Sequence, residues 1–198
     1  MDSDITFFTS FKAIGDPLDD IGQHSAAFSW EREKLATNPL LAIGRDEGVY
    51  KFCHDHGFKY ISDVTLASDR GLDTTHPMLR SIFKVAVANT KTPFMCLINS
   101  DIIVGPSFHL ALNRLLRSNK NPFVVGIRHD ITLSHAATDE RSYKELWKRK
   151  DLKAHRTGGS DYFAFTKRFA EQMLTFMPDY VMGCAAWDNW LHWVALNR

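Results

Sequence analysis

Residues 94–101 read FMCLINSD, a continuously apolar run that ends in Asn99, Ser100 and Asp101. Such a run after a Thr-Pro turn signal is typical of a central parallel strand that is covered on both faces. Ligands of open α/β sheets bind just beyond the carboxyl ends of such strands. We therefore expect Asp101 to hold a divalent cation, and through it a phosphate group. The alternative is that Asn99 and Asp101 only favour the turn that follows the strand.

Strand-like and helix-like segments alternate on both sides of this run. Further strands are expected at residues 5–8, 40–43, 59–61, 123–127 and 161–165. Helices are expected at residues 26–35, 49–56, 168–177 and about 185–196, with two more that begin near residues 77 and 105. Residues 15–17 are expected in a polar loop. The alternation predicts an α/β fold in which a mostly parallel sheet is flanked by helices on both faces.

Residues 129–160 depart from this alternation, because apolar residues become sparse and charge rises. One helical piece is expected around residues 143–150. A loop of this length in a compact domain is often a lid or a substrate loop, and we expect it on the acceptor side of a site. A disordered insertion is the alternative.

Composition limits the class of protein. The chain has 198 residues, is 44% hydrophobic and 24% charged, and carries a net charge of +1. This predicts one ordered domain, residues 1–198, and gives no reason to expect nucleic acid as a partner. Cys53, Cys96 and Cys184 show no disulfide or zinc spacing, which suits a reducing compartment. With no signal peptide and no run near the roughly 20 apolar residues of a membrane span, a cytoplasmic location is expected, for this chain or for a longer protein that contains it.

A second candidate site lies near the end of the chain, where residues 186–193 read AWDNWLHW. Asp188 falls in the first turn of a predicted helix, where the helix dipole favours an anion. Nearby Trp rings would desolvate this carboxylate, raise its pKa and make it a better general base. The alternative is that Asp188 caps the helix and pairs with His192, four residues on.

A third candidate is the segment 158–163, which reads GGSDYF. Glycines before a strand let the backbone approach a ligand closely. Asp161 could then hydrogen-bond a sugar, and Tyr162 could stack on it; a plain turn into an aromatic strand is the alternative. The His-Asp-His run at residues 54–56 is not a metal site, because adjacent helical residues do not share a face. No dinucleotide-binding, P-loop or hydrolase-elbow motif is present.

In this order, the segments resemble nucleotide-sugar-dependent glycosyltransferases of the GT-A fold, over essentially the whole chain. Within that fold they are similar to a small group that includes a chlorella-virus enzyme of capsid glycan synthesis. The resemblance implies that Thr9, Ser10 and Phe11 contact the nucleotide base. It also implies that Asp46 faces the nucleoside and Arg80 the diphosphate.

The resemblance further implies that Asn99-Ser100-Asp101 takes the place of the family's Asp-x-Asp motif, which binds the donor and a Mn²⁺ or Mg²⁺ ion. Asp101 keeps the acid that usually ligates the metal, whereas Asn99 removes one negative charge. His192 becomes a candidate for a further metal ligand. Asp188 is then the base that deprotonates the acceptor hydroxyl, with Trp187 as an acceptor contact.

The implied function is transfer of a sugar from a nucleotide-diphosphate donor, a UDP-sugar foremost, to a hydroxyl group of a glycan or glycoprotein acceptor. Inversion at the anomeric carbon is expected, and retention stays open. Two rivals remain. A sugar nucleotidyltransferase needs a basic Gly-rich loop after the first strand, where this chain has only Lys12 and Gly15. A non-catalytic carbohydrate- or nucleotide-binding module would retain ligand affinity without turnover.

Overall fold

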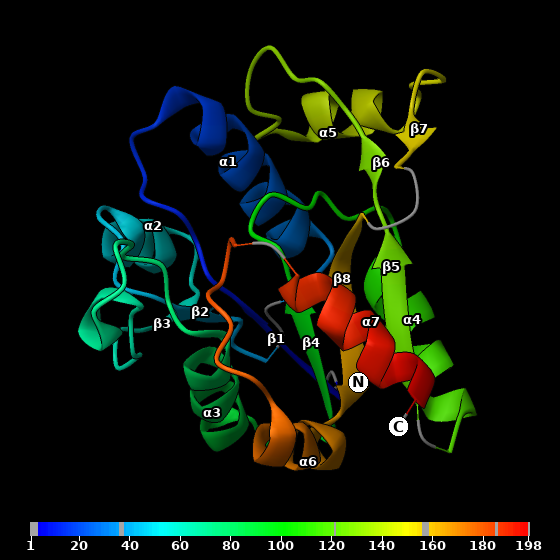
Figure 1. Cartoon of the computed structure of the whole chain (residues 1–198). Helices are drawn as coiled ribbons and strands as arrows, with labels where there is room; N and C mark the ends of the chain where they lie inside the picture. Colours follow the sequence, from blue (N-terminus) through cyan, green and yellow to red (C-terminus); the bar gives the residue numbers. More distant parts are fainter. Residues whose placement is uncertain (1–3, 36–37, 121, 156–158, 185, 198) are drawn as a thin grey trace.

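The computed structural model describes residues 4–35, 38–120, 122–155, 159–184 and 186–197. Gly158 and Ala185, which belong to segments considered above, lie outside these ranges. In the described residues, one sheet has the strand order β3-β2-β1-β4-β8-β5 (Figure 1). Its strands are β1 (Ile5–Thr9), β2 (Leu41–Ile43), β3 (Lys59–Ile61), β4 (Phe94–Ile98), β5 (Phe123–Ile127) and β8 (Ser160–Thr166).

The predicted α/β class with a mostly parallel sheet is confirmed. Strands β3, β2, β1 and β4 pair in parallel, whereas β8 runs antiparallel to both of its neighbours, β4 and β5. The carboxyl ends of β1, β2 and β4 therefore lie at one edge of the sheet. Because β8 runs the other way, its first residues lie at that same edge.

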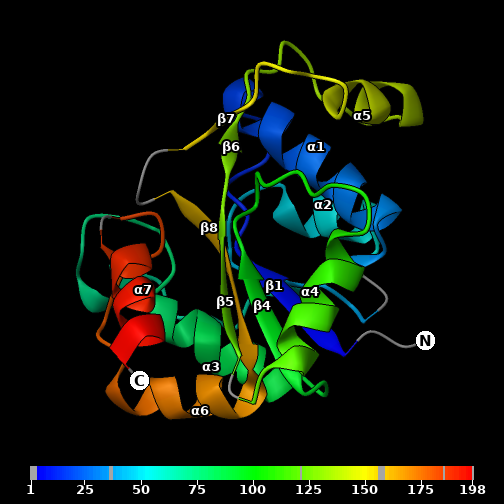
Figure 2. The same cartoon turned by 90° about the vertical axis from the view of Figure 1, so that its right-hand side faces the viewer.

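Strand β4 is central and covered on both faces, as its apolar run predicts. Cys96 and Ile98 belong to one buried cluster, and Met95 and Leu97 belong to the other. The first cluster is covered by α1 (Pro17–Arg32), α2 (Val49–Asp55) and α4 (Phe108–Ser118). The second is covered by α3 (Leu79–Asn89), α6 (Lys167–Phe176) and α7 (Trp187–Asn197). Figure 2 shows these two sets of helices on opposite sides of the sheet.

Helix α1 begins at Pro17, earlier than the residue 26 that the apolar pattern predicts. The side chain of Asp16 accepts a hydrogen bond from the backbone N–H of Leu18, and Pro17 opens the helix. Both residue types favour a helix start. Leu18 in the first turn is 86% exposed, and the buried positions of the following turns include Gln23 and Ser25. This part of the helix therefore has no apolar stripe that a sequence pattern could reveal.

The segment 129–160 is a structured excursion in its described part. Strands β6 (His129–Asp130) and β7 (Lys153–Ala154) pair antiparallel, and α5 (Glu140–Leu146) starts with a capping box at Asp139. Helix α5 thus begins and ends a few residues earlier than the helix expected around residues 143–150. A short 3₁₀ helix, η2 (Ser68–Arg70), lies between β3 and α3. No helix among the described residues is long and apolar enough to cross a membrane.

The excursion is anchored to the body of the domain. The buried Tyr143 hydroxyl donates to the Val104 carbonyl oxygen and lies 3.0 Å from the Glu33 carboxylate. The backbone N–H of Ala137 donates to Ser25 Oγ of α1 at 2.9 Å. Figure 1 shows α5, β6 and β7 beside the start of α1, above one end of the sheet. These contacts hold α5 over the carboxyl edge, where the predicted site residues gather.

Candidate functional site

A cleft lies at the carboxyl edge of the sheet, and we call it the central cleft. It is lined by Ser10, Phe11 and Lys12 after β1, Asp19 and Gln23 of α1, Asp46 after β2, His76 and Pro77, Asn99, Ser100 and Asp101 after β4, and Met182, Gly183 and Trp187 near α7. The parallel strands β1, β2 and β4 end together, which gathers residues from distant parts of the sequence. Most of the predicted donor-binding residues therefore share this one cleft.

Asp101 is the acid at the centre of these residues. It is exposed to the cleft, but the surrounding walls desolvate it and raise its pKa, and the nearby Asp161 carboxylate acts in the same direction. Lys12 and Arg128 oppose this rise through their positive charges. Gly22 of α1 leaves room for Asp101, because a Cβ atom at position 22 would lie 3.2 Å from the Asp101 Cβ.

Asn99 is held by Asp161 across the β4–β8 pair. Its side-chain Nδ2 donates to Asp161 Oδ1 at 2.8 Å, and its backbone N–H donates to the Asp161 carbonyl at 2.9 Å. Asp161 is only 5% exposed. Arg128 Nη1 donates to the same carboxylate oxygen at 3.2 Å. An Asp at position 99 would face a buried carboxylate without a proton to donate, so this contact explains why position 99 is an amide.

The same contacts define what Asp161 can do. Its carboxylate binds Asn99 and Arg128, and Arg128 is itself held by Asp130, which also binds His155 at 2.7 Å. Asp161 therefore orients two neighbours, and it also lines the side pocket described below, so a hydrogen bond from it to a sugar stays a prediction. Sequence reasoning missed Arg128, which has no motif around it. The only signal was its position directly after β5.

A second hollow, which we call the side pocket, shares part of its lining with the central cleft. Both are lined by Asn99, Gly183 and Trp187, and the side pocket adds Arg128, His155, Gly159, Ser160, Asp161 and Asp188. Asp188 lies in the first turn of α7, where its Oδ1 accepts the backbone N–H of Asn189 at 2.8 Å. The structure thus brings Asp188 and Trp187 to the same site as Asn99.

His192 does not join Asp101. Its Nε2 forms a hydrogen bond with Ser160 Oγ, and its ring packs edge-on against Phe163. Among the described residues, no group of three or more His, Cys, Asp or Glu side chains could hold a metal ion. The predicted ligand pair of Asp101 and His192 is therefore not assembled, because α7 directs His192 toward the beginning of β8.

Asp101 and Asn99 together still fit a hard cation. Mg²⁺ is commonly held by one or two carboxylates together with water and substrate phosphates. The Asn99 amide nitrogen is engaged by Asp161, which leaves its oxygen as the ligand atom. The cleft also holds the carboxylates of Asp19, Asp46 and Asp101 against one lysine, Lys12, which is already paired with Asp19 at 2.7 Å. A diphosphate entering here would need an added positive charge.

Thr9 and Phe11, which were predicted to contact the nucleotide base, are less exposed to solvent than that role suggests. Thr9 is fully buried, and it does not line the central cleft. Phe11 is 2% exposed and packs against Phe52 with ring centroids 5.0 Å apart. Its ring is mainly a core residue that closes the floor of the cleft, so Ser10 is the residue of this group that lines the cleft without being buried.

Asp46 lies in the cleft as expected, together with a residue that sequence reasoning missed. Burial raises the pKa of Asp46, and attraction to His76 partly offsets this effect. His76 directly precedes Pro77, and a lone histidine in a loop carries no sequence signal. Gly44 keeps the neighbouring backbone open, since a Cβ atom there would lie 3.2 Å from Ser10 Oγ.

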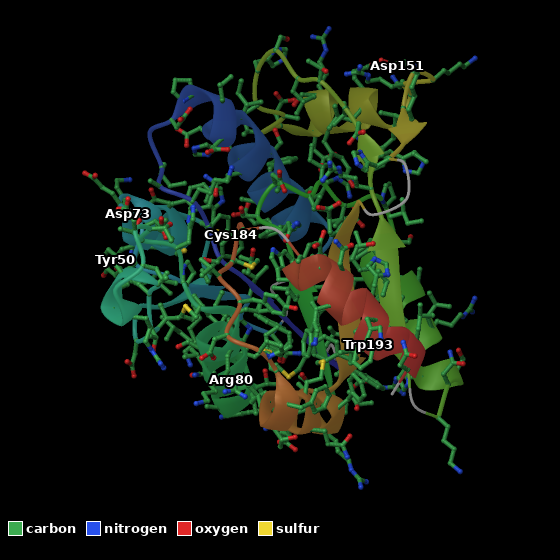
Figure 3. The ribbon with its side chains drawn as sticks, viewed as in Figure 1. Tyr50, Asp73, Arg80, Asp151, Cys184 and Trp193 are labelled. Atoms are coloured by element: carbon green, nitrogen blue, oxygen red, sulfur yellow. The ribbon has the colours of Figure 1, made fainter. Side chains whose placement is uncertain are left out.

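The structure does not bring Arg80 to the cleft. It is in the first turn of α3, which packs against α6, and its guanidinium donates to the Leu174 carbonyl at 3.3 Å and lies 3.7 Å from Asp179. Figure 3 shows Arg80 beside α3 and α6. The cationic side chains that reach the cleft and the side pocket are Lys12 and Arg128.

We therefore expect Arg80→Ala to leave nucleotide affinity unchanged and to lower the free energy of unfolding by about 1 kcal/mol, since it removes one hydrogen bond and a partly exposed ion pair. Lys12→Ala, inside the cleft, is the matched comparison and should weaken nucleotide binding. Calorimetric titration with UDP and thermal unfolding of both variants test this. A large loss of UDP affinity in a folded Arg80→Ala protein would return Arg80 to the site.

No model of a known protein family matches this sequence, and none of the curated proteins matches it. Among solved structures, the chain is similar to 4-diphosphocytidyl-2C-methyl-D-erythritol synthase from Anaerococcus prevotii DSM 20548, with a TM-score of 0.51, 12% identity, and coverage of 96% of this chain and 83% of that one. A protein from Desulfovibrio desulfuricans G20 assigned as a nucleotide-diphospho-sugar transferase matches with a TM-score of 0.47 and 14% identity, over 92% of this chain and 69% of that one. Neither is named as an enzyme of capsid glycan synthesis. The first of these similarities shows a shared fold: a mostly parallel sheet with helices on both faces.

Proposed function

We propose that the protein is a glycosyltransferase that moves a sugar from a nucleotide-diphosphate donor, a UDP-sugar foremost, to a hydroxyl group of a glycan acceptor. One observation carries this proposal: the central cleft, with Asp101 on its wall, shares Asn99, Gly183 and Trp187 with a side pocket that Asp188 also lines. A candidate nucleotide site and a candidate base thus lie in adjoining hollows.

The donor is expected to lie in the central cleft. Its base and ribose would occupy the part lined by Ser10, Asp46 and His76, and its diphosphate would reach Asp101. Asp101 and Asn99 would hold a Mn²⁺ or Mg²⁺ ion there. When bound, such an ion supplies the positive charge that stabilises a leaving diphosphate.

Transfer would take place where the cleft and the side pocket meet. The oxygen of the acceptor hydroxyl forms a bond to the anomeric carbon, and Asp188 accepts the proton that this hydroxyl loses. The bond from that carbon to the diphosphate breaks, and the nucleoside diphosphate leaves with the bonding electron pair. With Asp188 on the face of the sugar opposite the leaving diphosphate, the transfer would invert the anomeric carbon.

Asn99, Asp161 and Arg128 would position these groups. The buried Asp161 fixes the Asn99 amide and the Arg128 guanidinium, and all three line the side pocket. Groups that are already held in place do not have to be ordered when the substrate binds, which favours the transition state. Asp161 is in this account a positioning residue.

Release of nucleotide from a panel of UDP- and GDP-sugars, with and without a mixture of glycan acceptors, tests the proposal. Glycosyl transfer predicts that one donor releases its nucleoside diphosphate and that acceptor increases the rate. Formation of a nucleotide-sugar from a nucleoside triphosphate and a sugar phosphate would instead establish a nucleotidyltransferase. Tight binding without any turnover would establish a binding module.

A further inference from the structure

An additional cavity, which we call the apolar pocket, shares Asp101 with the central cleft and has a volume of about 530 Å³. Its lining is mostly apolar: Ile102, Ile103, Val104, Gly105, Phe108, Gly126, Ile127, Ile131, Leu146, Trp147, Leu152 and Tyr162. The charged members of the lining are Asp101, Arg128, Asp130 and Asp161, together with His129.

Two glycines allow aromatic rings to form the walls of this pocket. A Cβ atom at Gly126 would lie 1.6 Å from the Tyr162 ring, so the ring crosses the β5 backbone where a side chain would otherwise stand. A Cβ atom at Gly105 would lie 3.1 Å from the Trp147 ring. Phe108 packs edge-on against Tyr162 at 5.1 Å. The close approach of ring to backbone at both glycines gives the pocket defined walls.

Large apolar side chains of the lining remain open to solvent. Trp147 is 41% exposed and Ile127 is 62% exposed. Covering such surface is favourable by about 25 cal/mol per Å², and aromatic rings add preferred stacking geometries. A ligand with an apolar or aromatic group of suitable size would therefore gain affinity here, whereas a fully hydroxylated sugar would gain less.

The pocket is polar at the end that adjoins the proposed reaction centre. Arg128 and Asp161 line both the apolar pocket and the side pocket that contains Asp188, and Asp101 lines both the apolar pocket and the central cleft. A molecule whose hydroxyl-bearing end lies near Asp188 can therefore extend its remainder past Arg128 into the apolar pocket. This is the arrangement expected for an amphipathic acceptor.

We propose that the acceptor is a glycoside with an apolar aglycone, which the apolar pocket binds while the sugar hydroxyl is presented to Asp188. This inference rests on the proposed function, and it adds the chemical class of the acceptor. Trp147 and Ile127 then determine acceptor specificity, while the donor occupies the central cleft without contacting them.

A matched pair of probes tests the proposal without requiring turnover. Binding of p-nitrophenyl β-D-glucopyranoside and of methyl β-D-glucopyranoside is compared by ligand-observed saturation-transfer NMR in the presence of saturating UDP. We expect the aryl glycoside to bind about 10-fold more tightly, because its ring covers apolar surface that the methyl group cannot reach. UDP should not displace it, since the two sites differ.

Variants inside and outside the apolar pocket test whether the tighter binding of the aryl glycoside arises in that pocket. Trp147→Ala and Ile127→Asp should each remove it, and both residues are exposed enough for the protein to remain folded. Trp193→Ala and Leu110→Asp, at positions that are 49% and 66% exposed and outside the pocket, should keep it; Figure 3 shows Trp193 on α7. Equal binding of the two probes, or an aryl preference that survives both pocket variants, would overturn the proposal.

The two proposals fail in different ways. If a UDP-sugar is turned over but methyl and aryl glycosides serve equally as acceptors, the glycosyltransferase stands and the aglycone pocket is wrong. If no nucleotide binds while the aryl preference and its loss in the pocket variants are observed, the pocket is a binding site and the glycosyltransferase proposal is wrong.

Discussion

Asp188→Asn is expected to retain donor binding and to lose sugar transfer by about 10²–10⁴-fold, the range for removal of a general base. The substitution removes the proton acceptor but keeps the shape of the side chain. Asp188 Oδ1 accepts a hydrogen bond from the backbone N–H of Asn189, and the Oδ1 atom of an asparagine can accept the same bond. The start of α7 should therefore remain intact, so that the change reports on chemistry instead of folding.

Asp73→Asn provides the matched control, because Asp73 is exposed and lies outside the central cleft, the side pocket and the apolar pocket. Its transfer rate should equal that of the unmodified protein. Initial rates of nucleotide release with acceptor, measured beside UDP affinity, separate the two effects. Near-normal transfer by Asp188→Asn would remove Asp188 as the base.

The second large effect is expected at Asn99. Asn99→Asp places a second carboxylate against Asp161, at the 2.8 Å contact that the amide now makes. An uncompensated charge at such a buried contact costs about 3 kcal/mol. For a domain of this size, that corresponds to a fall in Tm of roughly 5–10 °C.

The reciprocal exchange makes this prediction specific. In Asn99→Asp combined with Asp161→Asn, the hydrogen bond can re-form with donor and acceptor reversed, so much of the lost stability should return. Asn119→Asp, at an exposed position, loses the hydrogen bond that Nδ2 donates to the Leu115 carbonyl oxygen, and its fall in Tm should be clearly smaller. Thermal unfolding of the two single variants and the double variant gives the coupling energy directly. Additive losses in the double variant would contradict the Asn99–Asp161 contact.

The fold could be predicted from the sequence largely because of β4. Its five apolar residues need cover on both faces, and helices with apolar stripes on either side in the sequence supply it. The orientation of β8 could not be predicted in this way. An alternating aromatic strand fits either direction, and a register that places Asp161 beside Asn99 depends on contacts between residues 62 positions apart.

Whether a predicted residue reaches the central cleft depends on the element that carries it. Residues that follow strands reach it, whereas two predicted residues on helices do not. Ser10, Asp46 and Asp101 follow parallel strands, and the topology alone collects them. Arg80 and His192 are on helices, whose rotation about their axes is set by packing against α6 and β8. A family motif gives the order of such residues along the chain but not the direction in which each one points.

The departure from the Asp-x-Asp pattern has a physical explanation. Position 99 lies against Asp161 of the neighbouring strand, which is buried and held by Arg128, so an amide suits this contact better than a second carboxylate. Asn99 then offers a neutral amide oxygen, and Asp101 is the charged group that remains open to the cleft. We therefore expect metal-dependent nucleotide binding to depend chiefly on Asp101.

A calorimetric titration with UDP, with and without Mn²⁺, tests the central claim most directly when it is carried out on the unmodified protein and on Asp101→Ala. The account predicts that UDP binds the unmodified protein, that Mn²⁺ strengthens this binding at least 10-fold, and that Asp101→Ala removes the Mn²⁺ effect while the protein stays folded. Absence of UDP binding under both conditions, or a Mn²⁺ effect unchanged in Asp101→Ala, would contradict it.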